Sequence, residues 1–125
     1  MKKFLPIAAV FGGSMRGMIC RMWHGRTPRT RADAYASFLV RRAIPDYRSI
    51  EGNIDVAILL RHERDVTHFI TVTHWQSEDA IRAFAGDDLL KAKYYPEDEH
   101  FLLEFEPTVQ HFEVAALQGG GGSAR

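Results

Sequence analysis

The side chains best suited to proton transfer in this chain of 125 residues are six histidines. An unperturbed imidazole titrates at about pH 6.5, which makes histidine the usual general base at neutral pH. The six are His24, His62, His68, His74, His100 and His111. His111 shares a predicted strand face with Glu113, a carboxylate that could orient its ring and raise its basicity. His111 is therefore a candidate base, with a structural hydrogen bond as the alternative.

The remaining histidines suit structural roles better. His62 and His100 lie in polar connections, where we expect solvated rings, and His24 ends the first predicted strand as a weaker candidate. His68 and His74 share one strand face, but six residues span roughly 20 Å at about 3.3 Å per residue, so they cannot bind one metal ion within a monomer. No zinc spacing, phosphate-binding glycine loop or Ser/His/Asp order is visible. We expect no metal and no cofactor.

Aromatic side chains are numerous enough to form either a core or a binding slot. They include Trp23, Tyr35, Phe38, Phe69, Trp75, Phe84, Tyr94 and Tyr95. Trp75 and Phe84 lie on either side of a helix start and would pack together with or without a ligand. The Tyr94 hydroxyl can donate a hydrogen bond, and Arg21 shares a strand face with Trp23, where a guanidinium could hold an anionic phenolate. A core role for the aromatic rings and a surface ion pair for Arg21 are the alternatives.

The charge balance narrows the range of partners. Formal net charge is zero, from 16 basic and 16 acidic side chains, and 46% of residues are hydrophobic. These values are typical of one globular domain and argue against a polyanion-binding surface. No apolar run approaches the roughly 20 residues that span a bilayer, so we expect neither nucleic acid nor a membrane as partner. The zero nevertheless hides a split, because residues 1–50 carry a net +8 and residues 51–125 a net −8.

The two ends differ in composition from the middle. Residues 1–17 resemble a leader or extension, with a signal peptide, a folded segment and a start at Met15 or Met18 as alternatives. Residues 118–125 are glycine-rich and predict a flexible tail. Cys20 is the single cysteine, which excludes an internal disulfide and favours a reduced, cytoplasmic setting. The folded domain is therefore expected over residues 18–117.

Periodicity within that domain predicts the order strand, helix, strand, strand, helix, strand. Thr30 is expected to cap the first helix and Pro45 to end it, while Ser77 caps the second and Gly86 stops it. The strands are expected at 19–24, 54–61, 66–75 and 108–115, with a short additional helix at 88–93. Rules for hairpins and crossovers then favour an α+β, ferredoxin-like βαββαβ sandwich with an antiparallel sheet.

This sandwich covers one sheet face with helices and leaves the other bare. Strand 66–75 is apolar on both sides, with Val66, Ile70 and Val72 on the bare face and Phe69 and Trp75 on the covered one. A bare apolar face usually marks an interface, so we predict a homodimer in which two sheets pack face to face. The layout also sets the basic first helix beside the acidic second one. The two halves of the charge split are therefore expected to neutralise each other within one molecule.

Six segments then carry a resemblance to a known family. They are Met22–Gly25, Pro45–Gly52, Thr71–Ser77, Ala80–Gly86, Tyr94–Asp98 and Val109–Val114. Through them, and over roughly residues 18–114, the chain resembles the antibiotic biosynthesis monooxygenase (ABM)-like proteins, members of the dimeric α/β-barrel superfamily. The junction of strand, Trp75, Ser77 and helix is moderately specific for that fold, and it is not specific for an activity.

The resemblance implies a small cofactor-independent monooxygenase that oxidises an aromatic or quinol-like molecule with O₂. Such chemistry needs a dry aromatic slot, a base with a pKa of about 7 and a donor for the developing oxyanion. Tyr94 and His111 are then the catalytic candidates. The expected substrate pocket consists of Arg21, Trp23, Trp75, Phe84 and Tyr95. The alternative is a non-catalytic dimeric module that binds a small hydrophobic molecule or acts as an accessory protein.

The haem-degrading branch of the family fits this chain less well. Its members carry an Asn on the first strand, a Trp on the helix after the third strand and a haem-ligating His on the next short helix. Strand 19–24 contains no Asn, and the other two positions match Phe84 and Tyr94. Tyrosine can ligate ferric haem, so haem binding stays open although the haem-degrading set of residues is absent.

Overall fold

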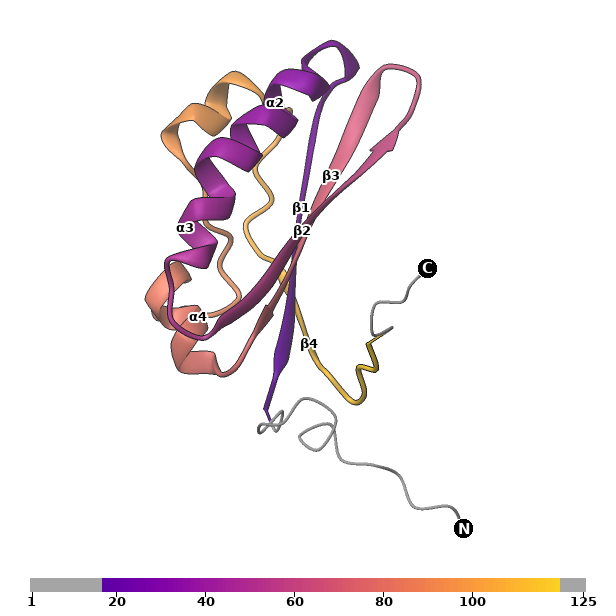
Figure 1. Cartoon of the computed structure of the whole chain (residues 1–125). Helices are drawn as coiled ribbons and strands as arrows, with labels where there is room; N and C mark the ends of the chain where they lie inside the picture. Colours follow the sequence, from indigo (N-terminus) through magenta and orange to yellow (C-terminus); the bar gives the residue numbers. More distant parts are fainter. Residues whose placement is uncertain (1–16, 120–125) are drawn as a thin grey trace.

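The computed structural model describes residues 17–119 as a four-stranded antiparallel sheet with helices on one side (Figure 1). In chain order its elements are β1 (Ile19–Pro28), the 3₁₀ turn η1 (Arg29–Arg31), α2 (Ala32–Phe38), the π-helical η2 (Leu39–Ala43), α3 (Ile44–Arg48), β2 (Asn53–His62), β3 (Val66–Trp75), α4 (Glu78–Ala85), the 3₁₀ turn η3 (Pro96–His100) and β4 (Gln110–Glu113). The predicted α+β, ferredoxin-like sandwich is confirmed. Residues 1–16 and 120–125 lie outside the described part, so the expectations for leader and tail stay predictions.

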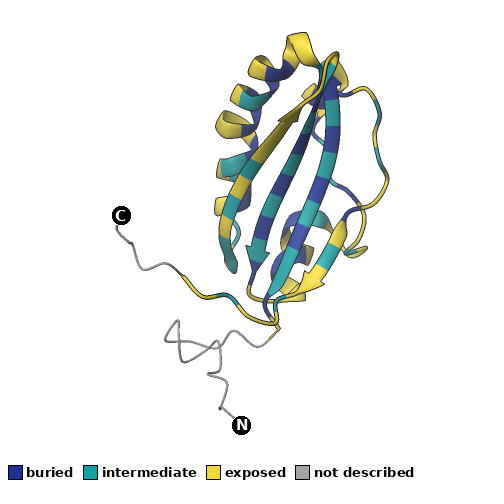
Figure 2. Ribbon diagram, turned by 90° about the vertical axis from the view of Figure 1, so that its right-hand side faces the viewer, coloured by how far each residue is buried: buried dark blue, intermediate teal, exposed yellow. Residues whose placement is uncertain are grey.

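The sheet has the strand order β2-β3-β1-β4. Along β1 and β3, buried and half-buried residues alternate, because successive side chains point to opposite faces (Figure 2). β3 spans the residues predicted for it, whereas β1 continues beyond His24 because its pairing with β3 extends to Pro28 opposite Val66. β4 is shorter than the predicted 108–115. Thr108 forms only an isolated bridge with Lys91.

Pro45 does not end the first helix, contrary to the prediction from sequence. The helical path continues through η2 and α3 to Arg48. A proline ring crowds the carbonyl one α-helical turn earlier and offers no amide hydrogen. The wider π-helical turn of η2 directly precedes α3, and Pro45 then occupies the first turn of α3, where an amide donor is dispensable. Thr30 is not a cap either, since it lies inside η1 and α2 begins without a side-chain cap.

The second predicted helix has the expected ends. The Ser77 hydroxyl accepts a hydrogen bond from the Ala80 amide, and Gly86 ends α4 with a φ of 98°. The additional helix predicted at 88–93 does not form. Residues 88–91 make a single turn, and the amide of Ala92 donates to Pro107 in a backbone contact 2.9 Å long. Pairing with the segment before β4 therefore replaces a local helix in this region.

Asp98 holds the η3 turn against the first helix from a buried position. Tyr35 Oη donates to its Oδ1 at 2.8 Å, and the Tyr95 amide donates to its Oδ2 at 2.7 Å. Burial raises the pKa of the Asp98 carboxyl, although these two hydrogen bonds act in the opposite direction. This contact fixes where the chain places Tyr94 and Tyr95.

The other sheet face carries no helix in the described part of the chain, and Figure 2 looks directly onto it. Its side chains come from the even-numbered positions of β1 and β3 and from their partners in β2 and β4. They include Met22, Leu59, Ile70, Val72 and Phe112, which are half-buried or exposed. No helix within residues 17–119 combines the length and apolar character needed to cross a membrane.

Candidate active site

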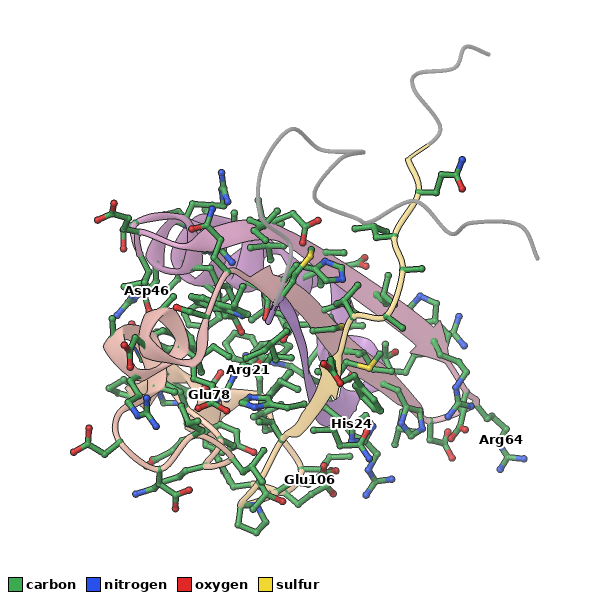
Figure 3. All side chains as sticks on the ribbon, turned by 90° about the horizontal axis from the view of Figure 1, so that it is seen from below. Arg21, His24, Asp46, Arg64, Glu78 and Glu106 are labelled. Atoms are coloured by element: carbon green, nitrogen blue, oxygen red, sulfur yellow. The ribbon has the colours of Figure 1, made fainter. Side chains whose placement is uncertain are left out.

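Arg21 is a buried cation on the helix-covered face of β1, and it is only 3% exposed. Its Nη1 donates to the carbonyl of Leu89 at 2.6 Å, and its Nη2 donates to that of Lys91 at 3.0 Å. Burial lowers the pKa of this guanidinium from its ordinary value. Within residues 17–119 Arg21 forms no ion pair, so its alternative role as a surface ion pair is not found. Arg21 instead anchors the segment after α4 to the sheet, and Figure 3 shows it in the middle of the molecule.

His111 lies opposite Arg21 on β4. Its Nε2 is 2.9 Å from Arg21 Nη1. Arginine has only donors, so this nitrogen accepts and the ring proton sits on Nδ1. Burial, followed by the positive charge of Arg21, lowers the pKa of His111. The ring is therefore a neutral acceptor whose partner is Arg21 and not Glu113, and a substrate proton would have to displace that contact.

This contact predicts a pH effect on stability. Because the folded-state pKa of His111 is lowered, the unfolded chain binds its proton more readily. The stabilisation is complete above the unfolded pKa of about 6.5 and is lost as the pH falls through the folded pKa. We expect His111→Gln, whose amide oxygen can still accept from Arg21, to lose less stability between pH 7.5 and 5 than the wild type. Urea unfolding at both pH values measures the difference, and identical losses would contradict the assignment.

Tyr94 and Trp23 meet edge to face, with ring centroids 6.0 Å apart. Tyr94 Oη donates to the carbonyl of Glu106 at 2.6 Å, and burial raises the pKa of its hydroxyl. Gly25 makes room for the indole, because a Cβ there would lie 2.5 Å from the Trp23 ring. Within residues 17–119 the buried Trp23 Nε1 has no hydrogen-bond partner. The indole N–H nevertheless lies on the Tyr94 side, because Trp23 lowers the pKa of the Tyr94 hydroxyl against the larger, opposite effect of burial.

Trp75, Phe84 and Tyr95 lie elsewhere in the interior. Trp75 and Phe84 pack with centroids 5.6 Å apart, and Phe84 stacks on Tyr47 at 4.5 Å. Tyr95 Oη donates to Oδ2 of Asp46 on α3 at 2.6 Å, and burial, reinforced by Asp46, raises its pKa. The sequence-predicted site residues thus form three groups: Arg21 with His111, Trp23 with Tyr94, and the aromatic rings around Trp75. The structure does not bring them around one shared cavity.

A slot of about 460 Å³ opens along β1, where its pairing with β4 ends. It is lined by Met22, Trp23, His24, Ile70, Glu106, Thr108, Val109 and Gln110. Of the sequence-predicted pocket residues, Trp23 lines it. Half of these residues are apolar, and two groups that can exchange protons, His24 and Glu106, face the slot from different segments. The slot therefore combines an aromatic wall with acid–base chemistry.

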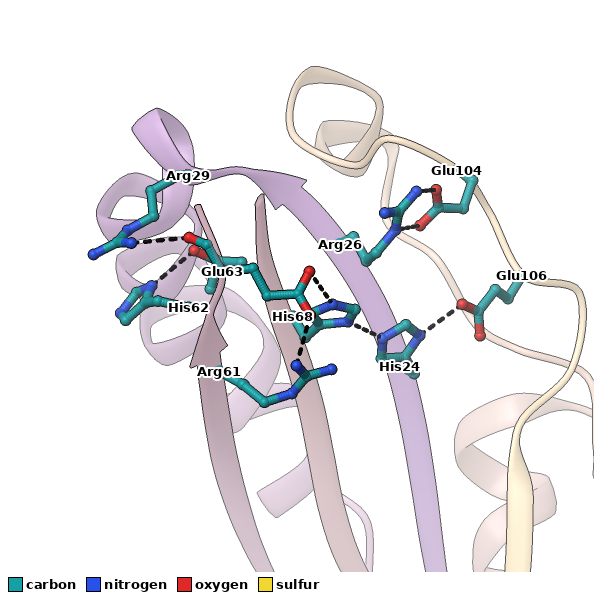
Figure 4. Close-up of polar contacts among 10 residues, drawn as sticks. His24, Arg26, Arg29, Arg61, His62, Glu63, His68, Glu104 and Glu106 are labelled. Carbon is teal, nitrogen blue, oxygen red and sulfur yellow. Dashed lines mark hydrogen bonds and ion pairs between the residues drawn. The ribbon is translucent and has the colours of Figure 1, made fainter. Parts of the chain in front are cut away.

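His24 belongs to a chain of polar contacts across the bare sheet face (Figure 4). Its Nδ1 is 2.6 Å from Oε2 of Glu106, and its Nε2 is 2.9 Å from Nδ1 of His68. His68 Nε2 in turn lies 3.3 Å from Oε1 of Glu63. Arg61, which contacts the same carboxylate at 2.6 Å, lowers the pKa of Glu63, with His68 acting in the same direction. We call Glu106, His24, His68 and Glu63 the histidine chain.

The number of protons that satisfies the histidine chain can be counted. Each carboxylate faces a ring nitrogen that must carry a proton to donate, and the contact between the rings needs one more. Three protons on four ring nitrogens make one imidazole neutral and the other an imidazolium. With two protons, one of the three contacts lacks its donor. With four protons, the facing nitrogens His24 Nε2 and His68 Nδ1 both carry hydrogen and repel each other. All three contacts of the histidine chain therefore have a donor when the two rings share three protons.

His24 was only a weaker candidate from sequence, and Glu106 was not among the predicted site residues. The signal that could have found His24 and His68 is strand register. His24 pairs with Ile70, so His68 is its diagonal neighbour on the same face. That register depends on the pairing of β1 with β3, two strands that are not neighbours in the sequence. Glu106 comes from an irregular segment, and periodicity gives no position for it.

No group of three or more His, Cys, Asp or Glu side chains within residues 17–119 is arranged to hold a metal ion.

Comparisons with known proteins add the fold class. No family model matches the chain, and no curated protein matches it. A solved structure from Bacillus cereus does match: a provisionally assigned antibiotic biosynthesis monooxygenase, 15% identical, with a TM-score of 0.54. The match covers 82% of this chain and 98% of that one.

The chain therefore has an ABM-like fold, and the resemblance noted in its sequence is confirmed at that level. An identity of 15% shows the fold alone. The activity must be argued from the site.

Proposed function

We propose that the chain is a cofactor-independent monooxygenase that oxidises a phenol or quinol-like molecule in the slot beside Trp23. The observation that carries this proposal is the slot itself, where an aromatic wall meets Glu106 and His24. A phenol and O₂ give a quinone and water, so one oxygen atom enters the substrate and the substrate supplies all the electrons. No external reductant is needed.

The histidine chain supplies the base in this proposal. With two ring protons, one carboxylate-facing contact lacks its donor, and uptake of the phenol proton through Glu106 completes the set. The resulting phenolate is the electron-rich species that reacts with O₂. The donor to the phenolate oxygen comes in this proposal from the polar lining of the slot, Thr108 or Gln110, and not from Tyr94 as expected, because the Tyr94 hydroxyl is engaged with Glu106 and Trp23 Nε1 is buried. Tyr94 holds the Glu106 segment in place through its hydrogen bond to that residue's carbonyl.

O₂ uptake with a panel of hydroquinones and phenols tests the proposal. We expect protein-dependent uptake with at least one member, and one ¹⁸O atom from ¹⁸O₂ in the product. Uptake at the rate of the protein-free control across the panel would contradict the proposed activity.

A homodimer formed by the bare sheet faces is part of the proposal. Proteins of this fold are typically dimeric, and the face carries the apolar side chains Met22, Ile70, Val72 and Phe112. Met22, Ile70 and Gln110 also line the slot. A partner sheet would therefore cover the half-open slot and exclude water from the phenolate, which strengthens its electrostatic contacts.

Two neighbouring leucines on β2 test the dimer. Leu59 lies on the bare face and is 47% exposed, while Leu60 points to the other side and is 39% exposed. We expect Leu59→Glu to weaken the dimer at least tenfold, about 1.4 kcal/mol, because a carboxylate would be buried in the interface. Leu60→Glu is the matched control and should leave it unchanged. Sedimentation equilibrium measures both, and equal effects, or a wild-type monomer, would contradict the interface.

The second candidate is a non-catalytic dimeric module that binds a small hydrophobic molecule. It is favoured by the interior around Trp75, which aromatic side chains fill, and by the engaged acceptor of His111. A Trp75→Phe variant leaves Trp23 as the single tryptophan and makes its fluorescence report on the slot. Saturable quenching by phenols without O₂ uptake would favour this module.

A further inference from the structure

A second cavity, of about 500 Å³, lies on the helical side of the molecule, away from the slot. It forms where the first helix faces η3. Its lining consists of Arg31, Phe38, Arg41, Arg42, Glu97, His100 and Phe101. Three guanidinium groups and one carboxylate therefore share a hollow with two aromatic rings. We call it the arginine cavity.

The three arginines are only partly offset by carboxylates: Glu97 lines the same cavity, and Asp46 lies within reach of the charge of Arg42. Within residues 17–119, Arg31, Arg41 and Arg42 form no ion pair within the 4.0 Å limit that defines one. Two of the acidic residues expected to offset them, Glu78 and Asp79, pair instead with Arg82 inside α4. The positive half of the charge split therefore leaves a local excess of positive charge in the arginine cavity.

Aromatic stacking restrains two of these guanidinium groups. Arg31 lies 4.7 Å from the centroid of Phe101, and Arg42 lies 4.4 Å from that of Tyr95. A guanidinium stacked on a ring keeps its N–H donors free at its edges, where they match the paired oxygens of a phosphate or carboxylate. Stacking also reduces the rotamer entropy lost on binding.

We propose that the arginine cavity binds a small aromatic anion, a molecule that carries a phosphate or carboxylate group on a ring. The anionic group lies between the guanidinium groups of Arg31, Arg41 and Arg42. The ring packs against Phe38 and Phe101. This inference does not rest on the proposed oxygenase activity, because the cavity lies on the other side of the sheet and shares no lining residue with the slot.

Calorimetric titration with four probes tests the proposal: phenyl phosphate, benzoate, inorganic phosphate and phenol. We expect phenyl phosphate or benzoate to bind at least tenfold more tightly than inorganic phosphate and phenol, and binding to weaken as salt increases. Comparison of the first two distinguishes a phosphate ligand from a carboxylate one. Equal affinity for inorganic phosphate, or no saturable binding of either aromatic anion, would overturn it.

Variants locate the binding. Arg31→Gln and Arg42→Gln should each raise the Kd for the preferred probe at least tenfold, while Arg64→Gln, a fully exposed arginine on the β2–β3 hairpin, should not change it. Circular dichroism checks that each variant is folded. O₂ uptake should be unchanged in the same variants, which separates this site from the slot. An unchanged Kd in both cavity variants, with their folds intact, would overturn the assignment.

Discussion

Replacing Trp75 with alanine is expected to lower the free energy of unfolding by about 3–5 kcal/mol. The side chain is fully buried, and its ring packs against Phe84 and Tyr47 with centroids 5.6 and 6.2 Å away. Its Nε1 donates to Oγ1 of Thr73 at 2.8 Å. Truncation therefore loses apolar burial, leaves a cavity and removes a hydrogen bond to a buried hydroxyl. Urea unfolding followed by circular dichroism measures the change.

The control for this variant is Phe105→Ala, an aromatic truncation at a side chain that is 44% exposed. Its cost should be about 1 kcal/mol or less, because little apolar surface is lost. Both measurements need one fixed protein concentration, since the proposed dimerisation would add to the apparent stability. A cost below about 1.5 kcal/mol for Trp75→Ala would mean that the space around the ring is loosely filled, as a ligand pocket is. The ligand site would then be assigned to the interior around Trp75 and not to the slot.

Most of the fold follows from local signals in the sequence. Alternation in Val66–Trp75, the Ser77 cap and the Gly86 stop are each set by neighbouring residues, and each was predicted as observed. The errors arise where distant contacts override local preference. Pro45 is accommodated by a π-helical turn, and residues 88–93 pair with the chain near Thr108 instead of forming a helix.

The candidate site could be predicted only in part, for the same physical reason. The sequence points to histidine and aromatic side chains, and side chains of both kinds gather beside β1. Their partners depend on long-range contacts: His24 meets His68 through strand register, and it meets Glu106 through an irregular segment. His111 illustrates the converse. Its sequence neighbour Glu113 suggested a carboxylate partner, but cross-strand pairing gives it Arg21.

The charge split shows how far composition alone can be used. Folding does place both halves in one domain, and ion pairs join them. Arg26 of the first half pairs with Glu104 of the second, and Lys93 of the second half pairs with Asp46 of the first. Neutralisation is local, however, because an ion pair requires contact within a few ångströms. A net charge of zero therefore coexists with a cavity lined by three arginines.

Replacing His24 with alanine is expected to lower kcat for O₂ uptake by roughly 10²- to 10⁴-fold, the range typical of a lost general base. The variant cuts the histidine chain between Glu106 and His68. Glu106 must then take up the phenol proton without the His24 imidazole, with which it shares a proton in the wild type. KM should change less, since Trp23 and the apolar walls of the slot stay in place. Glu106→Gln should lose activity similarly, because an amide keeps the shape of the side chain but cannot accept the proton. Steady-state O₂ uptake with the substrate found in the panel measures both.

His74→Ala is the matched control for His24→Ala. His74 lies on the same sheet face, and its Nδ1 also contacts a carboxylate, Asp55, at 2.8 Å, but neither residue lines the slot. A role in the dimer or in the surface charge would be shared by both histidines, whereas proton transfer in the slot belongs to His24 alone. We therefore expect full activity in His74→Ala and loss of activity only when His24 is changed. Equal losses in the two variants, accompanied by dissociation of the dimer, would show that the histidine chain acts through assembly and not through catalysis.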